Sequence, residues 1–131
     1  MPKEAMFMSN LIYISSPYTN GDVAENVRLA CEAGNELLKR GYIPFIPHLS
    51  LFWHFAFPKS WGTWMRIDLE ILSRCDAVLR IGGASIGADK EVRFAEKLGL
   101  CVYYSLEELE KDEDIKAFNT LGELIEDLRS E

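Results

Sequence analysis

The stretch that decides the fold is Asp76–Leu98, DAVLRIGGASIGADKEVRFAEKL. Residues 76–81 form a short apolar run typical of a buried strand, and a glycine-rich turn follows at 82–87. From about Ala88 the residues favour a helix, which should stop at Gly99 because glycine commonly follows a helix end. A strand, a tight turn and a helix in this order predict one unit of a parallel α/β sheet.

The same alternation continues on both sides of this unit. The remaining strands are predicted at residues 11–15, 42–46 and 100–104, and the remaining helices at about 22–40, at 61–74, after Ser105 and over 118–128. Pro44 predicts that its strand is distorted or lies at a sheet edge, and residues 47–60 are expected to form a long aromatic loop. The pattern predicts a single α/β domain over residues 1–131, a three-layer sandwich with a mainly parallel sheet.

Composition excludes several classes of protein. The chain has 131 residues, of which 48% are hydrophobic, enough for one core and too many for a disordered chain. Its net charge of −7 argues against binding a nucleic-acid polymer, and the charge lies in residues 107–131, which hold ten acidic and three basic residues. We expect no membrane span, because the most apolar stretch, 42–58, is interrupted by prolines and histidines. Three cysteines and no leader-like segment indicate reduced thiols, which we expect to be buried and inert, and a cytoplasmic protein.

Ligands of open parallel sheets bind beyond the carboxyl ends of the strands. Residues 15–21, the loop after Ile46 and residues 82–91 should therefore converge at one site. His48, just after the second strand, could touch a ligand there. His48 and His54 have no third partner at metal spacing, so we expect no metal.

The turn at 82–87 opens a helix, where backbone N–H groups attract anions, and Ser85 adds a hydroxyl. It does not match the dinucleotide motif, because Ala84 stands where glycine is needed. Nor does it match the P-loop, because Ala88-Asp89 replaces Lys followed by Ser or Thr. The turn is either an anion or hydroxyl cradle of another type or only a tight turn.

Glu91 lies in the first turn of this helix, in line with Ala95 and Leu98 on the face expected to be buried. An acid in a first turn either serves the chemistry or only interacts favourably with the helix dipole. The helix dipole favours its ionised form, whereas burial opposes it.

Asp68 interrupts an apolar stripe of its helix. The stripe is formed by Trp61, Trp64, Ile71, Leu72 and Cys75. A carboxylate in this position is costly unless it is paired, so it either has a functional role or bonds a backbone amide or an arginine such as Arg66 or Arg93. Two carboxylates at one site are what cleavage of a glycosidic bond requires. The tryptophans either stack on a base or belong to the core or a subunit interface, and Asp76 is expected to bond nearby backbone.

Three segments in this order and spacing resemble the nucleoside 2-deoxyribosyltransferase family, which includes the 5′-monophosphate N-glycosidases. They are Ile12–Tyr18 (IYISSPY), Ile67–Val78 (IDLEILSRCDAV) and Ser85–Glu91 (SIGADKE), the last followed by Ala95. The resemblance covers residues 10–104, which would be the catalytic core, and leaves 105–131 as an acidic C-terminal helical extension. It implies a flavodoxin-like or Rossmann-like fold and a homo-oligomer, a dimer or higher, with the active site near a subunit interface.

The resemblance also implies residue roles. Glu91 would attack C1′ of the sugar and displace the base, and Asp68 would orient Glu91 or assist the departing base. Tyr13 would face the sugar and Glu91, and Ser85 with the N–H groups of Ile86 and Gly87 would hold the 5′ end. A tyrosine late in a buried strand is otherwise a core residue. The expected substrate-binding residues are Ser15, Ser16, His48, Ser85, Ile86 and Gly87. No metal or organic cofactor is needed for such a reaction.

With this resemblance, the sequence predicts an enzyme of nucleotide metabolism that cleaves the N-glycosidic bond of a (2-deoxy)nucleoside or nucleoside 5′-monophosphate. The expected route is double displacement through a glycosyl–Glu91 intermediate, with transfer to water or another nucleobase. Family members that hydrolyse nucleotides commonly carry a basic residue after the first strand to hold the phosphate, and residues 17–21 hold none, which argues against a 5′-monophosphate substrate. Ser85, however, stands where base-exchanging members tend to carry a carboxylate, which favours hydrolysis. Two alternatives stay open. One is a non-catalytic nucleotide-binding or sensing module, and the other is an oligomeric structural protein that uses its aromatic loop as an interface.

Overall fold

The computed structural model describes residues 10–115 and 128–129. Within them, one parallel sheet has the strand order β2-β1-β3-β4. The strands are β1 (Leu11–Ser15), β2 (Ile43–Phe45), β3 (Ala77–Arg80) and β4 (Cys101–Tyr103). The helices are α2 (Val23–Lys39), α3 (Leu51–Ala56), α4 (Trp61–Leu72), α5 (Ile86–Lys97) and α6 (Leu106–Glu110), with a 3₁₀ turn, η1, at Pro47–Ser50.

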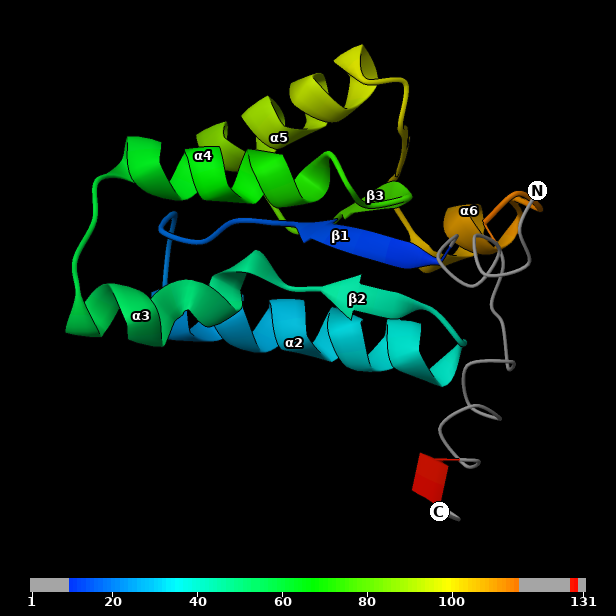
Figure 1. Cartoon of the computed structure of the whole chain (residues 1–131), viewed down its shortest axis with the longest axis horizontal. Helices are drawn as coiled ribbons and strands as arrows, with labels where there is room; N and C mark the ends of the chain where they lie inside the picture. Colours follow the sequence, from blue (N-terminus) through cyan, green and yellow to red (C-terminus); the bar gives the residue numbers. More distant parts are fainter. Residues whose placement is uncertain (1–9, 116–127, 130–131) are drawn as a thin grey trace.

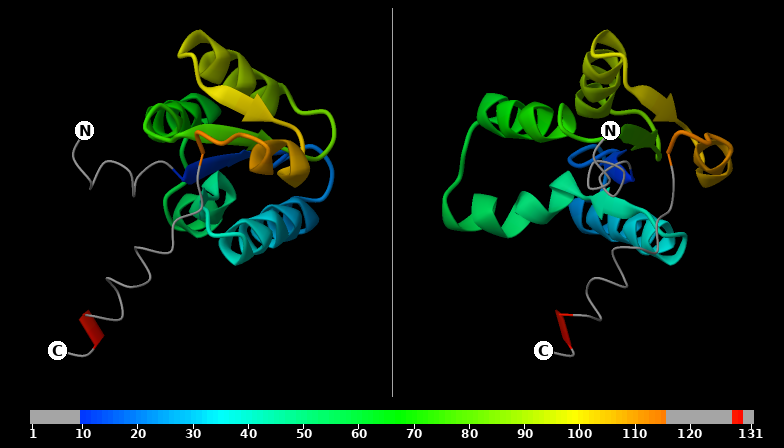
Figure 2. Two further views of the ribbon diagram at one scale, coloured as in Figure 1. Left: turned by 90° about the vertical axis from the view of Figure 1, so that its right-hand side faces the viewer. Right: turned by 45° about the vertical axis from the view of Figure 1, so that its right-hand side comes forward.

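Helices cover both faces of this sheet. Figure 1 shows α4 and α5 on one side of β1 and β3, with α2 and α3 on the other. The two turned views in Figure 2 keep the same separation. The predicted three-layer, flavodoxin-like α/β fold is confirmed, and β2 lies at an edge of the sheet, as Pro44 predicted.

The central strand β1 supplies both faces of the core. Ile12 and Ile14 are fully buried against α2, where they pack with residues such as Leu37. Tyr13 points to the opposite face, among residues of α4 and α5. Because successive strand side chains alternate in direction, Ser15 shares the face of Tyr13. This parity aims both hydroxyl groups at α5.

The start of the predicted acidic extension packs on the core. Ser105 caps α6 by accepting a hydrogen bond from the N–H of Glu108 at 3.1 Å, and Leu109 is fully buried in the cluster beneath α2. Most of the helix predicted over residues 118–128 lies outside the described residues.

Several local predictions need correction. Residues 47–60 are not one loop, because η1 and α3 occupy most of this segment. Helix α5 begins at Ile86 rather than Ala88, because Ser85 caps it. Trp61 and Leu98, expected on buried stripes, are exposed.

The cysteines also depart from expectation. Cys75 is buried, but Cys31 is half-buried and Cys101 is exposed, so a set of three buried thiols is wrong. All three are free thiols. The expected backbone role of Asp76 is confirmed, since its carboxylate accepts the N–H of Leu11 at 2.8 Å. Among the described helices, none is both long and apolar enough to cross a membrane.

Candidate active site

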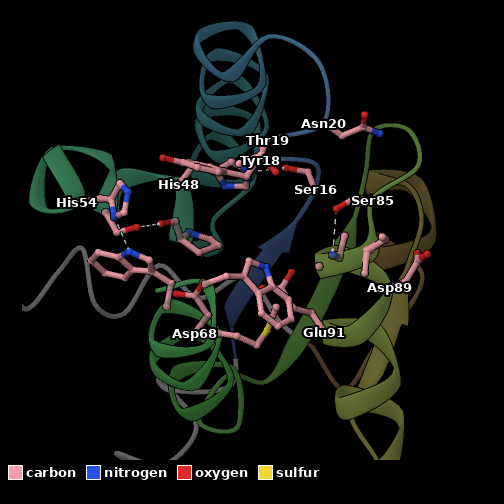
Figure 3. A pocket seen from close by; sticks show the side chains of 18 of the residues that line it. Ser16, Tyr18, Thr19, Asn20, His48, His54, Asp68, Ser85, Asp89 and Glu91 are labelled. Carbon is pink, nitrogen blue, oxygen red and sulfur yellow. Dashed lines mark hydrogen bonds between the residues drawn. The ribbon is translucent and has the colours of Figure 1, made fainter. Parts of the chain in front are cut away.

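A cavity of about 910 Å³ lies beyond the carboxyl ends of β1 and β3. The predicted segments converge on it: the β1–α2 loop, the turn after β2 and the start of α5. Figure 3 shows Asp68 and Glu91 between His54 on one side and Ser85 on the other. Its lining residues are Ser16, Tyr18–Asn20, Pro47, His48, Ser50, His54, Lys59, Trp61, Trp64, Met65, Asp68, Ala84–Asp89 and Glu91.

Glu91 is held from beneath by β1. Its side chain lines the cavity, although the residue is only 6% exposed. The Tyr13 hydroxyl donates a hydrogen bond to Oε2, and the Ser15 hydroxyl donates to Oε1 at 2.8 Å. Each carboxylate oxygen has a second lone pair, so both bonds leave acceptor capacity for a ligand. Tyr13 and Ser15 do not themselves line the cavity, and they reach it only through their bonds to Glu91.

The surroundings of Glu91 act on its protonation in opposite directions. The pKa of Glu91 is raised on balance, because the effect of burial exceeds the lowering by the bonds from Tyr13 and Ser15 and by the charge of Arg80. Burial and the nearby carboxylates raise the pKa of the Tyr13 phenol well above its usual value, so this group stays a donor. The two hydroxyl donors stabilise the ionised form of Glu91 and so partly offset its burial.

Asp68 faces the same cavity without comparable support. Burial, and then the charge of Glu91, raise the pKa of Asp68 from 3.8 to about 7. Of the arginines considered as partners, neither Arg66 nor Arg93 is bonded to it among the described contacts. The two carboxyl groups therefore differ in their support: two hydroxyl groups donate to Glu91, whereas Asp68 accepts no such bond among the described contacts and its pKa is raised to about 7.

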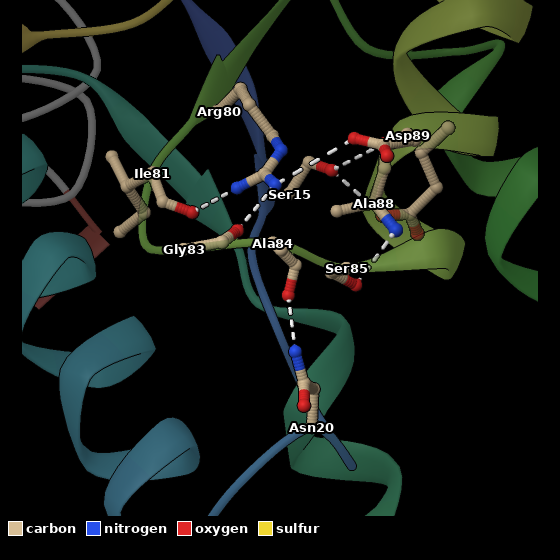
Figure 4. Close-up of polar contacts among 10 residues, drawn as sticks. Ser15, Asn20, Arg80, Ile81, Gly83, Ala84, Ser85, Ala88 and Asp89 are labelled. Carbon is tan, nitrogen blue, oxygen red and sulfur yellow. Dashed lines mark hydrogen bonds and ion pairs between the residues drawn. The ribbon is translucent and has the colours of Figure 1, made fainter.

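The glycine-rich turn is fixed through its carbonyl groups (Figure 4). Arg80 donates to the carbonyl oxygens of Ile81 and Gly83, the second at 2.7 Å, and Asn20 donates to that of Ala84 at 2.7 Å. Ser85 accepts the N–H of Ala88 at 3.1 Å as the helix cap. The N–H groups of the first helical turn have no acceptor within the helix, so those of Ile86 and Gly87 are available to a ligand at the cavity.

Gly82 packs closely against Pro17 of the β1–α2 loop. Its φ is +80°, and a Cβ there would lie 2.7 Å from Cδ of Pro17. We expect Gly82→Ala to lower the free energy of unfolding by about 1–2 kcal/mol through backbone strain and by about 1–3 kcal/mol more through overpacking. Gly21→Ala is the matched control, because Gly21 has φ +93° with nothing within 4 Å of its Cβ position. Equal losses in urea unfolding would contradict the predicted contact with Pro17.

His48 and Ser16 both line the cavity, and they also bond each other. His48 is 3% exposed, and its Nε2 lies 3.1 Å from both the Ser16 hydroxyl and the Pro17 carbonyl oxygen. Burial lowers the pKa of His48, so the ring is neutral and Nε2 carries the proton that the carbonyl accepts. These bonds fix the β1–α2 loop, and His48 therefore shapes the site whether or not it touches a ligand.

One end of the cavity, called here the His54 end, is formed by His54, Lys59 and Trp64 and was not predicted from the sequence. Trp64 donates from Nε1 to Nδ1 of His54 at 2.8 Å, and the backbone N–H of Lys59 donates to the same nitrogen at 3.2 Å. Lys59 supplies a cation that the β1–α2 loop lacks. Of these residues, only Trp64 had a predicted part in substrate binding, as one of the tryptophans that could stack on a base.

Metal binding has no support in the part of the chain that the structure describes. No group of three His, Cys, Asp or Glu side chains there lies close enough to hold an ion.

Comparisons with known proteins support the fold. The chain is similar to a solved structure of 2-deoxyribosyltransferase from the psychrotolerant bacterium Bacillus psychrosaccharolyticus, with a TM-score of 0.52 and 22% sequence identity. The match covers 70% of this chain and 69% of that chain. A comparison with curated proteins finds no match. A family model described as "Domain of unknown function (DUF7768)" matches residues 10–105, and the chain therefore belongs to the DUF7768 family.

Proposed function

We propose that the protein cleaves the N-glycosidic bond of a nucleoside, or of its 5′-monophosphate, by double displacement at Glu91. The observation that carries this proposal is the carboxyl pair. Glu91 is buried, held at both oxygens and open to the cavity, and Asp68 faces the same space with a pKa of about 7. The structural likeness to a 2-deoxyribosyltransferase is consistent with a 2′-deoxy sugar.

In the first step, a Glu91 oxygen forms a bond to C1′ while the bond from C1′ to the base nitrogen breaks. The electron pair leaves with the base, and protonated Asp68 supplies the proton that neutralises it. In the second step, water attacks C1′, the ester bond to Glu91 breaks, and Asp68 takes up the proton that the water loses. A second base in place of water gives transfer instead of hydrolysis. Neither step needs a metal or an organic cofactor.

The start of α5 suits the 5′ end of the substrate. The Ser85 hydroxyl and the N–H groups of Ile86 and Gly87 lie at the cavity, where the helix dipole favours an anion. They can bind a 5′-hydroxyl or a 5′-phosphate. Tyr13 and Ser15 act through Glu91, whose position they set.

The test is base release by the purified protein from the common 2′-deoxynucleosides, ribonucleosides and their 5′-monophosphates, followed by chromatography. We expect free base and free sugar or sugar phosphate from at least one 2′-deoxy substrate. Adding a second base then separates transfer from hydrolysis. Binding without release would favour the non-catalytic nucleotide-binding module. The absence of both binding and release would contradict the enzyme and the binding module alike.

Self-association belongs to the same proposal. Aromatic side chains on and after α3 are exposed: Phe52, Trp53, Phe55 and Phe57. A patch of this kind commonly marks an interface, and the family resemblance implies a homo-oligomer. We expect a dimer or higher oligomer by light scattering and a smaller species after the double change of Phe52 and Phe55 to serine. A wild-type monomer at micromolar concentration would contradict this.

A cytoplasmic location is also proposed, on the strength of the three free thiols.

A further inference from the structure

We propose that the His54 end of the cavity selects bases that carry a carbonyl, rather than an amino group, on the edge far from the glycosidic bond. This inference rests on the proposed placement of a nucleoside at Glu91. It extends that function to a substrate class, the 6-oxopurines and the 4-oxopyrimidines.

The orientation of the substrate follows from the two ends of the cavity. C1′ must lie at Glu91, and Figure 3 shows Glu91 and Asp68 between Ser85 and His54. The Ser85 end offers a hydroxyl and backbone amides, which suit the 5′ end of a sugar. The His54 end offers the half-buried indole of Trp64, a surface on which a flat base can stack. The base therefore extends towards His54.

The hydrogen bonds of His54 fix its proton. Its Nδ1 accepts two N–H groups, those of the Trp64 indole and the Lys59 backbone. A ring nitrogen that accepts hydrogen bonds carries no proton, so the proton of the neutral ring is on Nε2. The indole N–H of Trp64 is already used in this bond. His54 lines the cavity, and its Nε2–H is the donor that these bonds leave to a ligand.

Lys59 adds the second donor. Its Nζ lies 5.0 Å from the ring centroid of Trp53 and 6.0 Å from that of Trp64, so the aromatic rings hold the ammonium at this end. Among the described carboxylates, none forms an ion pair with it. The Ser50 hydroxyl also lines the cavity, but its proton is already used in a hydrogen bond to the carbonyl oxygen of Pro47 at 2.9 Å. The ammonium of Lys59 and the ring N–H of His54 are therefore the donors at this end, and among the described contacts no carboxylate accepts from either of them.

A set of donors distinguishes carbonyl from amino groups. A carbonyl oxygen accepts from Lys59 or His54, whereas an amino group presents its own N–H to them and leaves the donors unpaired. Hydrogen bonds to charged groups are strong enough to give at least about tenfold discrimination, and a site built for one polar group rejects its counterpart.

Matched pairs test the inference: 2′-deoxyinosine against 2′-deoxyadenosine, and 2′-deoxyuridine against 2′-deoxycytidine. Dissociation constants are measured by calorimetry and base release by chromatography, on the same full-length protein. We expect the oxo member of each pair to bind at least about tenfold more tightly. Lys59→Met should reduce this ratio to about twofold or less, and Lys59→Arg should retain most of it, because the charge is kept. Lys97→Met is the control, since Lys97 is exposed at the far end of α5.

The outcomes separate the two proposals. Base release without oxo preference, preference for the amino member, or a ratio unchanged in Lys59→Met would overturn the inference alone. Tight oxo-selective binding that is lost in Lys59→Met, but without base release, would support the inference and overturn the proposed reaction. No binding of any member would overturn both.

Discussion

Replacing Glu91 by glutamine is expected to stop base release while leaving substrate binding largely intact. The amide is nearly isosteric and lacks the nucleophilic oxygen, so the rate should fall by at least about 10³-fold, in the range seen for lost nucleophiles elsewhere. Folding should be preserved. The amide oxygen can still accept from Tyr13, and the Ser15 hydroxyl can turn to accept from the amide N–H groups.

Two readouts are needed for this variant. The release rate is followed by chromatography, and binding is followed as the rise in melting temperature on adding the best substrate. Glu96→Gln is the matched control, because Glu96 is exposed on the same helix. Loss of ligand-induced stabilisation together with the rate would instead assign Glu91 to recognition, and an unchanged rate would remove it from the mechanism.

Replacing Asp68 by asparagine is expected to stabilise the fold above pH 7 and to slow base release. Burial and the charge of Glu91 raise the pKa of Asp68 to about 7, so ionising it in the folded state is unfavourable. Asparagine has nearly the same shape and no charge. The reaction loses its proton donor, which costs about 10²-fold or more.

The pH dependence of stability follows from this shift. Below pH 3.8 the Asp68 carboxyl is protonated in both states and contributes no difference. Between pH 3.8 and about 7 the unfolded chain loses its proton first, so the free energy of unfolding falls as pH rises. Above about pH 7 the penalty is constant. The difference between Asp68→Asn and wild type should therefore grow across this window and then level off.

Urea unfolding from pH 4 to 9 measures this difference. Glu70→Gln is the control, since Glu70 lies on the same helix but is exposed and pairs with Arg74 at 3.4 Å. A variant less stable than wild type at pH 8 would contradict the unpaired, half-buried state of Asp68. In the wild type, base release should decline as pH rises above about 7, where Asp68 loses its proton.

Regular periodicity made most of the fold predictable. The β1 strand and the helices α2, α4 and α5 have apolar residues spaced for burial, and the structure contains all four elements. Helix α3 was missed because Leu51–Ala56, LFWHFA, is short and almost uniformly apolar, so it shows no helical period. Its side chains are exposed or half-buried, which only tertiary structure reveals.

The site was predictable where local pattern sets it. A carboxylate one helical turn from Ala95, after a strand and a tight turn, indicated Glu91, and the structure buries it on that face. The contacts of His54 and Lys59 were not predictable, because they depend on how the side chains of α3 pack against Trp64 of α4. Trp61 was misplaced for a similar reason, since it lies in the first turn of α4, beyond the packed part of the helix, beside Lys90.

The most direct test of the mechanism is mass spectrometry of the protein after rapid acid quenching during turnover of its best 2′-deoxy substrate. The account predicts that one peptide, the one containing Glu91, gains the mass of a dehydrated sugar or sugar phosphate, and that Glu91→Gln shows no such gain. Base release with no adduct under these conditions, or an adduct on another side chain, would contradict a glycosyl ester at Glu91.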